Sequence, residues 1–124
     1  MSLFYDKEKN MSLIDTLYNW IDFLKSIWDF INKIFVTVLN FVQNILNFFK
    51  NPSRLKKLKQ DSNKLAIAIK ENLDNGEYRV VNCLFDKEEQ TIVDMNDEAQ
   101  GIEAKDMDYQ TERTFGNRDM IILK

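Results

Sequence analysis

Polar side chains recur every three or four positions in the otherwise apolar run between residues 12 and 51. Placed at 100° per residue, these positions fall along one line, with the repeat of about 3.6 residues typical of a straight helix rather than the 3.5 of a coiled-coil seam. The pattern predicts one continuous amphipathic helix that begins after Ser12 and ends near residue 50, just before Pro52. The polar stripe of this predicted helix consists of Asp15, Asn19, Asp22, Ser26, Asp29, Lys33, Thr37, Asn40, Asn44 and Asn47.

The rest of this predicted helix is apolar over more than half of its circumference. A small soluble core needs an apolar stripe only about 100° wide, so a surface this wide requires a covering partner. Lipid and protein are both suitable partners. The apolar face consists of Trp20, Phe23, Ile27, Trp28, Ile31, Phe35, Val38, Phe41, Val42, Ile45, Phe48 and Phe49.

After Pro52 the pattern predicts a second, basic helix from Ser53 to the residues before Gly76. β-Branched and aromatic residues then lie on both sides of DKEEQ, which predicts a hairpin with strands at about 78–85 and 90–95. A short strand, a helix capped by Asp106 or Asp108 that ends near Gly116, and a closing strand in RDMIILK complete the predicted elements. The predicted fold class is therefore α+β, with a long amphipathic N-terminal helix, a second basic helix and a small C-terminal unit.

Charge divides the chain into the same three parts. Residues 1–50 hold five positive and five negative charges, residues 51–70 hold six positive and one negative, and residues 71–124 hold six positive and fourteen negative. We therefore expect a membrane-active or oligomerising helix at 1–51, a basic connecting helix at 52–76 and a small acidic α+β domain at 77–124. The acidic block disfavours nucleic acid as a partner.

Candidate chemistry is sparse. The chain contains no histidine, which removes the common catalytic triads and the usual proton-transfer residue. Its one cysteine, Cys83, lies in an apolar stretch and is predicted to be a buried small hydrophobe. The acidic turn DMNDEAQG lacks the glycine and glutamate that a calcium-binding loop needs at fixed positions. We expect no enzymatic activity, no cofactor and no metal site.

Membrane association is the function that this pattern favours. Either the whole helix lies in the interface with its apolar face in lipid, or its second half crosses the bilayer in a homo-oligomer whose polar stripe lines a pore. In the crossing geometry, the basic cluster keeps the C-terminal part cytoplasmic as a regulatory or docking domain. The residues predicted to contact anionic lipid are Arg54, Lys56, Lys57 and Lys59.

A soluble assembly is the alternative. The wide apolar face would then be buried in an oligomer or in the groove of a partner protein, and asparagine contacts would fix the register. The opening MSLFYDKEKN mixes both charge signs and shows no small-residue cleavage site, so no secretory signal peptide is expected. The expected location is the cytoplasmic side of a membrane.

Overall fold

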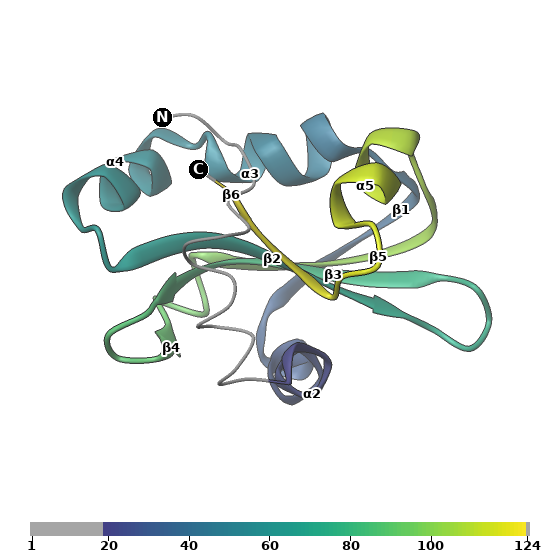
Figure 1. Cartoon of the computed structure of the whole chain (residues 1–124), viewed down its shortest axis with the longest axis horizontal. Coiled ribbons are helices and arrows are strands. Elements are labelled where there is room, and N and C mark those ends of the chain that lie inside the picture. Colours follow the sequence, from purple (N-terminus) through teal and green to yellow (C-terminus); the bar gives the residue numbers. More distant parts are fainter. Residues whose placement is uncertain (1–18, 124) are drawn as a thin grey trace.

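A six-stranded sheet with helices on both faces forms the centre of the computed structural model, which describes residues 19–123 (Figure 1). The strands are β1 (Asn32–Leu39), β2 (Lys64–Asn72), β3 (Tyr78–Asp86), β4 (Thr91–Ile92), β5 (Ala99–Met107) and β6 (Met120–Leu123). The helical segments are α2 (Trp20–Ile27), the 3-10 turn η2 (Trp28–Phe30), the π-helical segment η3 (Phe41–Leu46), α3 (Asn47–Phe49), α4 (Pro52–Gln60) and α5 (Tyr109–Phe115). The strand order is β1-β5-β3-β2-β6, and the short β4 pairs with β3.

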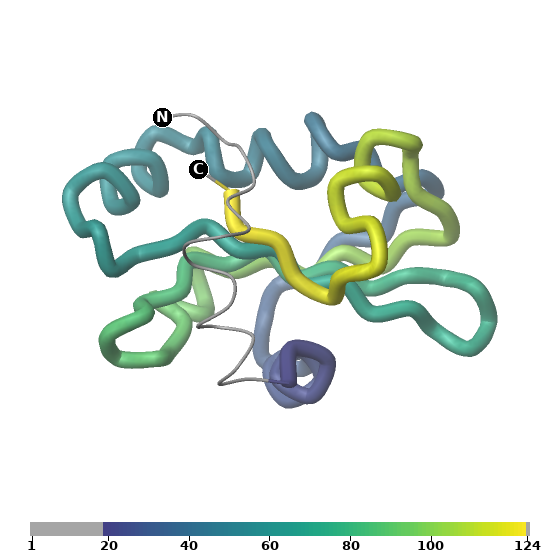
Figure 2. The backbone as a smooth tube through the Cα atoms, in the orientation of Figure 1, coloured from purple at the N-terminus to yellow at the C-terminus, as the bar shows by residue number. Residues whose placement is uncertain are grey.

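Two helical layers sandwich this sheet. Helix α2 lies on one face, whereas α3, α4 and α5 lie on the other (Figures 1 and 2). Strand β1 is parallel to β5, and every other pairing in the sheet is antiparallel. The tube in Figure 2 shows the chain running from α2 through β1 to the opposite layer, so β1 connects the two helical layers.

The predicted continuous helix from Ser12 to about residue 50 is wrong. Its first residues lie outside the described part of the chain, and from Trp20 onward it is divided into α2, η2, β1, η3 and α3. Segment 32–39, NKIFVTVL, is rich in β-branched residues, which pack well in strands and lose rotamer freedom in helices. Asn40 then caps a new helical segment by accepting a hydrogen bond from the Gln43 backbone N–H at 2.8 Å. No glycine or proline marks the breaks, and the polar repeat continues through all five of these elements.

The predicted second helix is also wrong in its second half. Helix α4 ends at Gln60, and the residues that were expected to continue it form β2, a central strand. Asp61 ends the helix, because its carboxylate accepts hydrogen bonds from the Asn63 N–H at 2.9 Å and the Lys64 ammonium at 2.7 Å. The alternating Ile and Ala residues of LAIAI supply one face of the sheet each, and both faces are buried.

Toward the C-terminus the elements lie closer to their predicted positions. Strand β3 covers the first predicted hairpin strand, but β4 contains only Thr91 and Ile92. Asp108 caps α5 by accepting from the Thr111 N–H at 2.9 Å, and Gly116 follows the helix with a φ of 56°. Strand β5 has nine residues, as many as β3, although the sequence predicted only a short strand there.

Two hydrophobic cores lie on opposite faces of the sheet. The core beneath α2 contains Trp20, Leu24, Ile27, Trp28, Ile31, Leu65, Ile67, Ile69, Val81, Cys83, Phe85, Ala99, Met120 and Ile122. The other core contains Leu39, Phe41, Ile45, Phe49, Ala66, Ala68, Val80, Leu84, Ile102, Ala104, Met107, Phe115, Ile121 and Leu123. The residues predicted as one apolar helix face are therefore distributed between two cores, because β1 carries the chain from one layer to the other. Cys83 is fully buried, as predicted.

All three predicted segments contribute strands to the same sheet. Segment 1–51 supplies β1, segment 52–76 supplies β2, and segment 77–124 supplies the remaining strands. Over residues 19–123, no helix has the length and apolar character needed to cross a membrane.

Candidate functional site

A polar cleft of about 440 Å³ lies where the first residues of β1 and β5 meet η3, α3 and the loop that precedes β5. Six of its lining residues are Asn or Gln, so we name it the carboxamide cleft. Its lining consists of Asn32, Ile34, Gln43, Asn44, Asn47, Phe48, Arg54, Asn96, Asp97, Ala99 and Gln100. A volume of this size is within the range of small-molecule sites, roughly 300–1,000 Å³.

Two asparagines position the helical wall of the cleft. The Asn40 side chain caps η3, and the Asn44 Oδ1 accepts a hydrogen bond from the Asn40 backbone N–H at 2.7 Å. The Asn44 carbonyl in turn accepts from the Asn82 Nδ2 at 2.8 Å, which joins η3 to β3 of the sheet. These contacts hold Gln43 and Asn47, one residue before and three after Asn44, at the cleft.

Asn82 lies in the sheet and hydrogen-bonds to the helical wall of the cleft through the Asn44 carbonyl. It is fully buried, and its register partner on β5 is Gln100, a lining residue. Its Oδ1 makes no hydrogen bond to any atom of residues 19–123. Leaving a buried acceptor unsatisfied costs about 1–3 kcal/mol, so Asn82 is a polar residue that the core tolerates at a price in stability.

Four carboxamides of the cleft are not engaged by the described part of the chain. The Asn32 Nδ2 donates to the Asn96 carbonyl at 3.0 Å, and the Asn44 side chain caps Asn40. By contrast, the side-chain amides of Gln43, Asn47, Asn96 and Gln100 make no hydrogen bond within residues 19–123, although the backbone groups of Gln43 and Asn96 do. Each of these amides offers two donors and an acceptor oxygen with two lone pairs. The cleft can therefore donate and accept several hydrogen bonds at once.

Arg54, the one cation among the described lining residues, is held by its neighbours. Its two terminal nitrogens donate to the Phe48 carbonyl at 3.1 Å and the Asp97 carbonyl at 2.9 Å. The guanidinium carbon also lies 3.8 Å from the centre of the Phe48 ring. Arg54 therefore ties α4 to α3 and to the loop before β5, and its remaining nitrogen faces a protein carboxylate.

That carboxylate belongs to Glu98, whose side chain is almost completely buried. The Glu98 Oε2 lies 3.7 Å from the Arg54 Nε and 3.6 Å from the Lys57 Nζ. These distances are those of ion pairs without hydrogen bonds, and within residues 19–123 neither the Glu98 Oε2 nor the Arg54 Nε has a hydrogen-bond partner. Two cations thus compensate the buried carboxylate and fix the wall behind the cleft.

The structure separates the residues of the predicted polar stripe. Asn44 and Asn47 line the cleft, and Asn40 caps η3 beside it. Asn19, Asp22, Ser26 and Asp29 belong to α2, its cap and η2, on the other face of the sheet, whereas Lys33 and Thr37 lie in β1. The Lys33 ammonium donates to the Trp28 carbonyl at 2.9 Å and the Ile31 carbonyl at 3.2 Å. Asp15 lies outside the described residues.

The other predicted site residues also have mixed environments. Of the predicted apolar face, Trp20, Ile27, Trp28, Ile31, Phe41, Ile45 and Phe49 are buried, Phe23 and Phe48 are partly buried, and Phe35, Val38 and Val42 are exposed. In the predicted lipid-contacting cluster, Arg54 and Lys57 face Glu98, and Lys56 and Lys59 are exposed.

Sequence reasoning missed the half of the cleft that comes from distant segments. Asn96 and Gln100 both belong to the acidic segment DMNDEAQG, whose sequence fits no calcium-binding loop and carries no other recognisable motif. Asn82 lies among apolar residues of β3, and a polar residue in the middle of a strand buried on both faces was the available signal. Within residues 19–123, no cluster of possible metal ligands is present.

No protein family, curated protein or solved structure matches this chain.

Proposed function

We propose that this chain is a non-enzymatic binding protein whose carboxamide cleft recognises a neutral, hydroxyl-rich ligand of saccharide size. The observation that supports the proposal is the convergence of four unengaged carboxamides, from η3, α3, β5 and the loop before β5, on one cleft of about 440 Å³. A sugar hydroxyl both donates and accepts, as a carboxamide does, so adjacent hydroxyls can pair with the two ends of one amide. The Asp97 carboxylate adds a further acceptor at the same cleft.

Anionic ligands fit this cleft poorly. A phosphate or sulfate group is usually bound by free arginine donors or a lysine ammonium. Each terminal nitrogen of Arg54 donates one of its two N–H groups, to the Phe48 and Asp97 carbonyls, and its Nε faces Glu98, so protein acceptors already hold the guanidinium. Among the described lining residues the only other charge is the negative one of Asp97, which would repel an anion.

Nucleobases fit the cleft less well than sugars. Recognition of an unpaired base usually includes stacking on an open aromatic face. Phe48 is the only aromatic residue in the described lining, and the Arg54 guanidinium already covers its ring. Hydrogen bonding by amides, rather than stacking, is therefore the main recognition chemistry that this cleft offers.

The test is an NMR titration of the ¹⁵N-labelled full chain, in which Asn and Gln side-chain amides give their own signals. The probes are neutral mono- and disaccharides, each matched by its sulfated form. We expect a neutral sugar to shift the side-chain signals of Gln43, Asn47, Asn96 and Gln100, and the sulfated form to shift them less. A panel that leaves all four signals unmoved at tens of millimolar, or a stronger response to the sulfated forms, would contradict the proposal.

Membrane association stays a prediction that no observation tests. Its main support, the prediction of a continuous amphipathic helix, is wrong. What still supports it is the basic cluster, of which Lys56 and Lys59 are exposed on α4. The predicted homo-oligomer has separate support from the edge of the sheet.

A further inference from the structure

Among the described strands, β1 is an edge strand of the sheet. It pairs only with β5 among the described strands, and it stands at one end of the strand order. An edge strand presents a row of unpaired backbone N–H and C=O groups on its outer side, which can pair with another strand. Soluble proteins usually protect such an edge with proline, a bulge or several charges.

β1 carries little of this protection. It is eight residues long, contains neither proline nor glycine, and pairs with β5 at a constant offset, with Thr37 the one residue that has no paired partner there. Its only charged residue is Lys33, whose ammonium is turned back to the Trp28 and Ile31 carbonyls. The outer edge of β1 is therefore close to neutral over its whole length.

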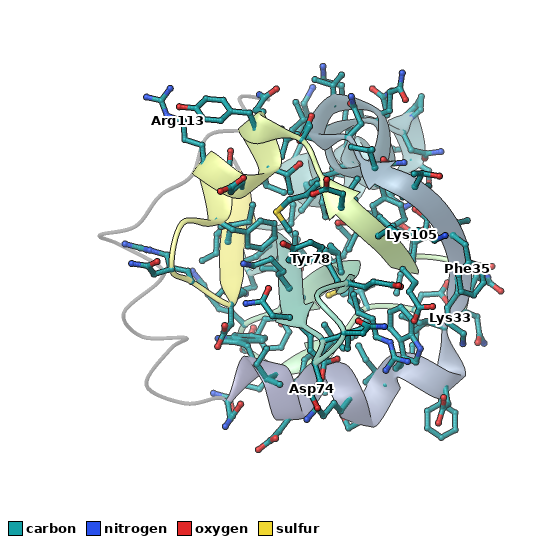
Figure 3. The ribbon with its side chains drawn as sticks, turned by 90° about the vertical axis from the view of Figure 1, so that its right-hand side faces the viewer. Lys33, Phe35, Asp74, Tyr78, Lys105 and Arg113 are labelled. Carbon is teal, nitrogen blue, oxygen red and sulfur yellow. The ribbon has the colours of Figure 1, made fainter. Side chains whose placement is uncertain are left out.

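Two apolar side chains of β1 are exposed, one on each face of the strand. Ile34 and Val36 pack against the core beneath η3 and α5, and Val38 continues that face while it is 48% exposed. Phe35 points to the other face and is 71% exposed. In Figure 3 the labelled Phe35 lies at the outer margin of the molecule, beside the strand.

We propose that β1 pairs with β1 of a second copy of this chain, antiparallel and about a twofold axis perpendicular to the sheet. Rotation about such an axis makes each face of one copy's sheet continuous with the same face of the other copy's sheet. Two residues that pair across the interface must therefore point to the same face. The register centred on Phe35 meets this condition. It places Phe35 against the partner's Phe35, Lys33 against the partner's Thr37, and Ile34 against the partner's Val36.

Charge and side-chain pairing select this register and this occupant. A register centred on Lys33 would put two ammonium groups opposite each other, whereas the register centred on Phe35 opposes no like charges and forms an aromatic cross-strand pair. A charged peptide would find no complementary row of charges on β1. A β-branched strand that carries little charge is the matching partner, and β1, with Lys33 as its one charged residue, is such a strand.

The expected dimer is weak. A single strand edge buries less surface than the roughly 1,200 Å² of the smallest stable interfaces. We therefore expect the association to depend on concentration, with a dissociation constant in the micromolar to millimolar range. The pairing is independent of the carboxamide cleft, so a failure of one proposal leaves the other standing.

The experiment is sedimentation equilibrium on the full chain over a range of concentrations, with Phe35→Glu and Phe35→Lys as variants. Each variant places like charges opposite each other on the twofold axis, so we expect association at least about tenfold weaker than in the wild type. Phe30→Glu is the matched control, because Phe30 is also 71% exposed but lies in η2, outside β1. Circular dichroism checks that each variant keeps the fold.

An equimolar mixture of the Phe35→Glu and Phe35→Lys chains makes the test specific for self-pairing. Opposite charges then face each other, and we expect the mixture to associate about fivefold or more better than either variant alone. A wild-type chain that stays monomeric at millimolar concentration would overturn the proposal. So would equal weakening by Phe30→Glu and Phe35→Glu, or a mixture that associates no better than its components.

Discussion

Asn44 shows how single residues serve both the fold and the cleft. Its side-chain oxygen accepts from the Asn40 N–H, its carbonyl accepts from Asn82, and its side chain lines the carboxamide cleft. At this scale, the polar residues that looked like a stripe on one helix act as caps, cross-links and cleft lining. Asp108 has a similar part at the start of η3, where its Oδ2 accepts a hydrogen bond from the Phe41 N–H at 3.2 Å.

Asp108 makes stability dependent on pH in the acid range. Burial raises the pKa of its carboxyl, but hydrogen bonds from the Thr111 hydroxyl and from the backbone N–H groups of Thr111 and Phe41 lower it by more, so the pKa lies below its ordinary value. The unfolded chain therefore takes up this proton first, and the stabilisation is present above the ordinary aspartate value, about pH 4, and is lost as pH falls through the folded-state value.

We predict that Asp108→Asn makes the free energy of unfolding depend less steeply on pH below about pH 4. Urea denaturation at several pH values between 2 and 6, on the order of five points, measures this slope. Asp29→Asn is the control, because Asp29 is exposed and makes no side-chain hydrogen bond within residues 19–123. An unchanged slope in Asp108→Asn would show that Asp108 is not a source of the acid sensitivity.

Gly101 is required by close packing on the face of the sheet beneath α2. A Cβ atom at this position would lie 2.9 Å from the Trp28 Cζ3 and 3.0 Å from the Lys33 Cγ. We predict that Gly101→Ala lowers the free energy of unfolding by about 1–3 kcal/mol, the usual cost of overpacking. Urea denaturation measures the loss, and adding Trp28→Phe should recover part of it by making room. A fully additive double variant would argue against this contact.

At the scale of elements, η3 depends on its N-cap. Asn40 accepts from the Gln43 N–H at 2.8 Å, and the loss of a capping side chain typically costs about 0.5–2 kcal/mol. We predict a loss of this size for Asn40→Ala and a smaller loss for Asn40→Ser, since serine can also cap. The measurement is the shift in the midpoint of thermal unfolding. Equal losses in the two variants would mean that the side chain acts by some means other than capping.

The same cap explains how far the elements could be predicted. Asn40 and Asp61 each end one element and begin another, but an asparagine or aspartate without a neighbouring glycine or proline also fits a solvated helix face. Segment 32–39 satisfied the helical repeat, and only its β-branched residues indicated a strand. Asp108 and Gly116 were recognisable because an N-cap and a glycine bracket a short polar segment, which is a local signal.

The candidate site was less accessible to prediction than the elements. Asn44 and Asn47 were visible as part of the predicted polar stripe, and Gln43 lies one residue before Asn44. Asn96 and Gln100 join them only because β1 pairs in parallel with β5, a pairing between residues more than 60 positions apart. Long-range pairing of this kind leaves no mark in a local pattern, so the cleft could not be assembled from one sequence.

At the scale of the whole molecule, the sheet connects the two proposals. The carboxamide cleft includes Asn32 and Ile34, which lie on the strand whose outer edge is proposed to pair with a second copy. A twofold axis perpendicular to the sheet would place both clefts on the same side of the dimer. Two such clefts would bind a repeated ligand more tightly than one, because the second binding step becomes intramolecular.

Calorimetric titration with the neutral sugar that gives the largest NMR shifts tests the carboxamide cleft most directly. The double variant Gln43→Leu and Asn47→Leu removes two exposed amides of the cleft, and Asn117→Leu removes an exposed amide outside it. Losing two or more hydrogen bonds costs about 1–3 kcal/mol, so we predict that the double variant binds roughly tenfold to a hundredfold more weakly while Asn117→Leu binds as the wild type does. Equal affinity in all three proteins would contradict the assignment of the cleft as the binding site.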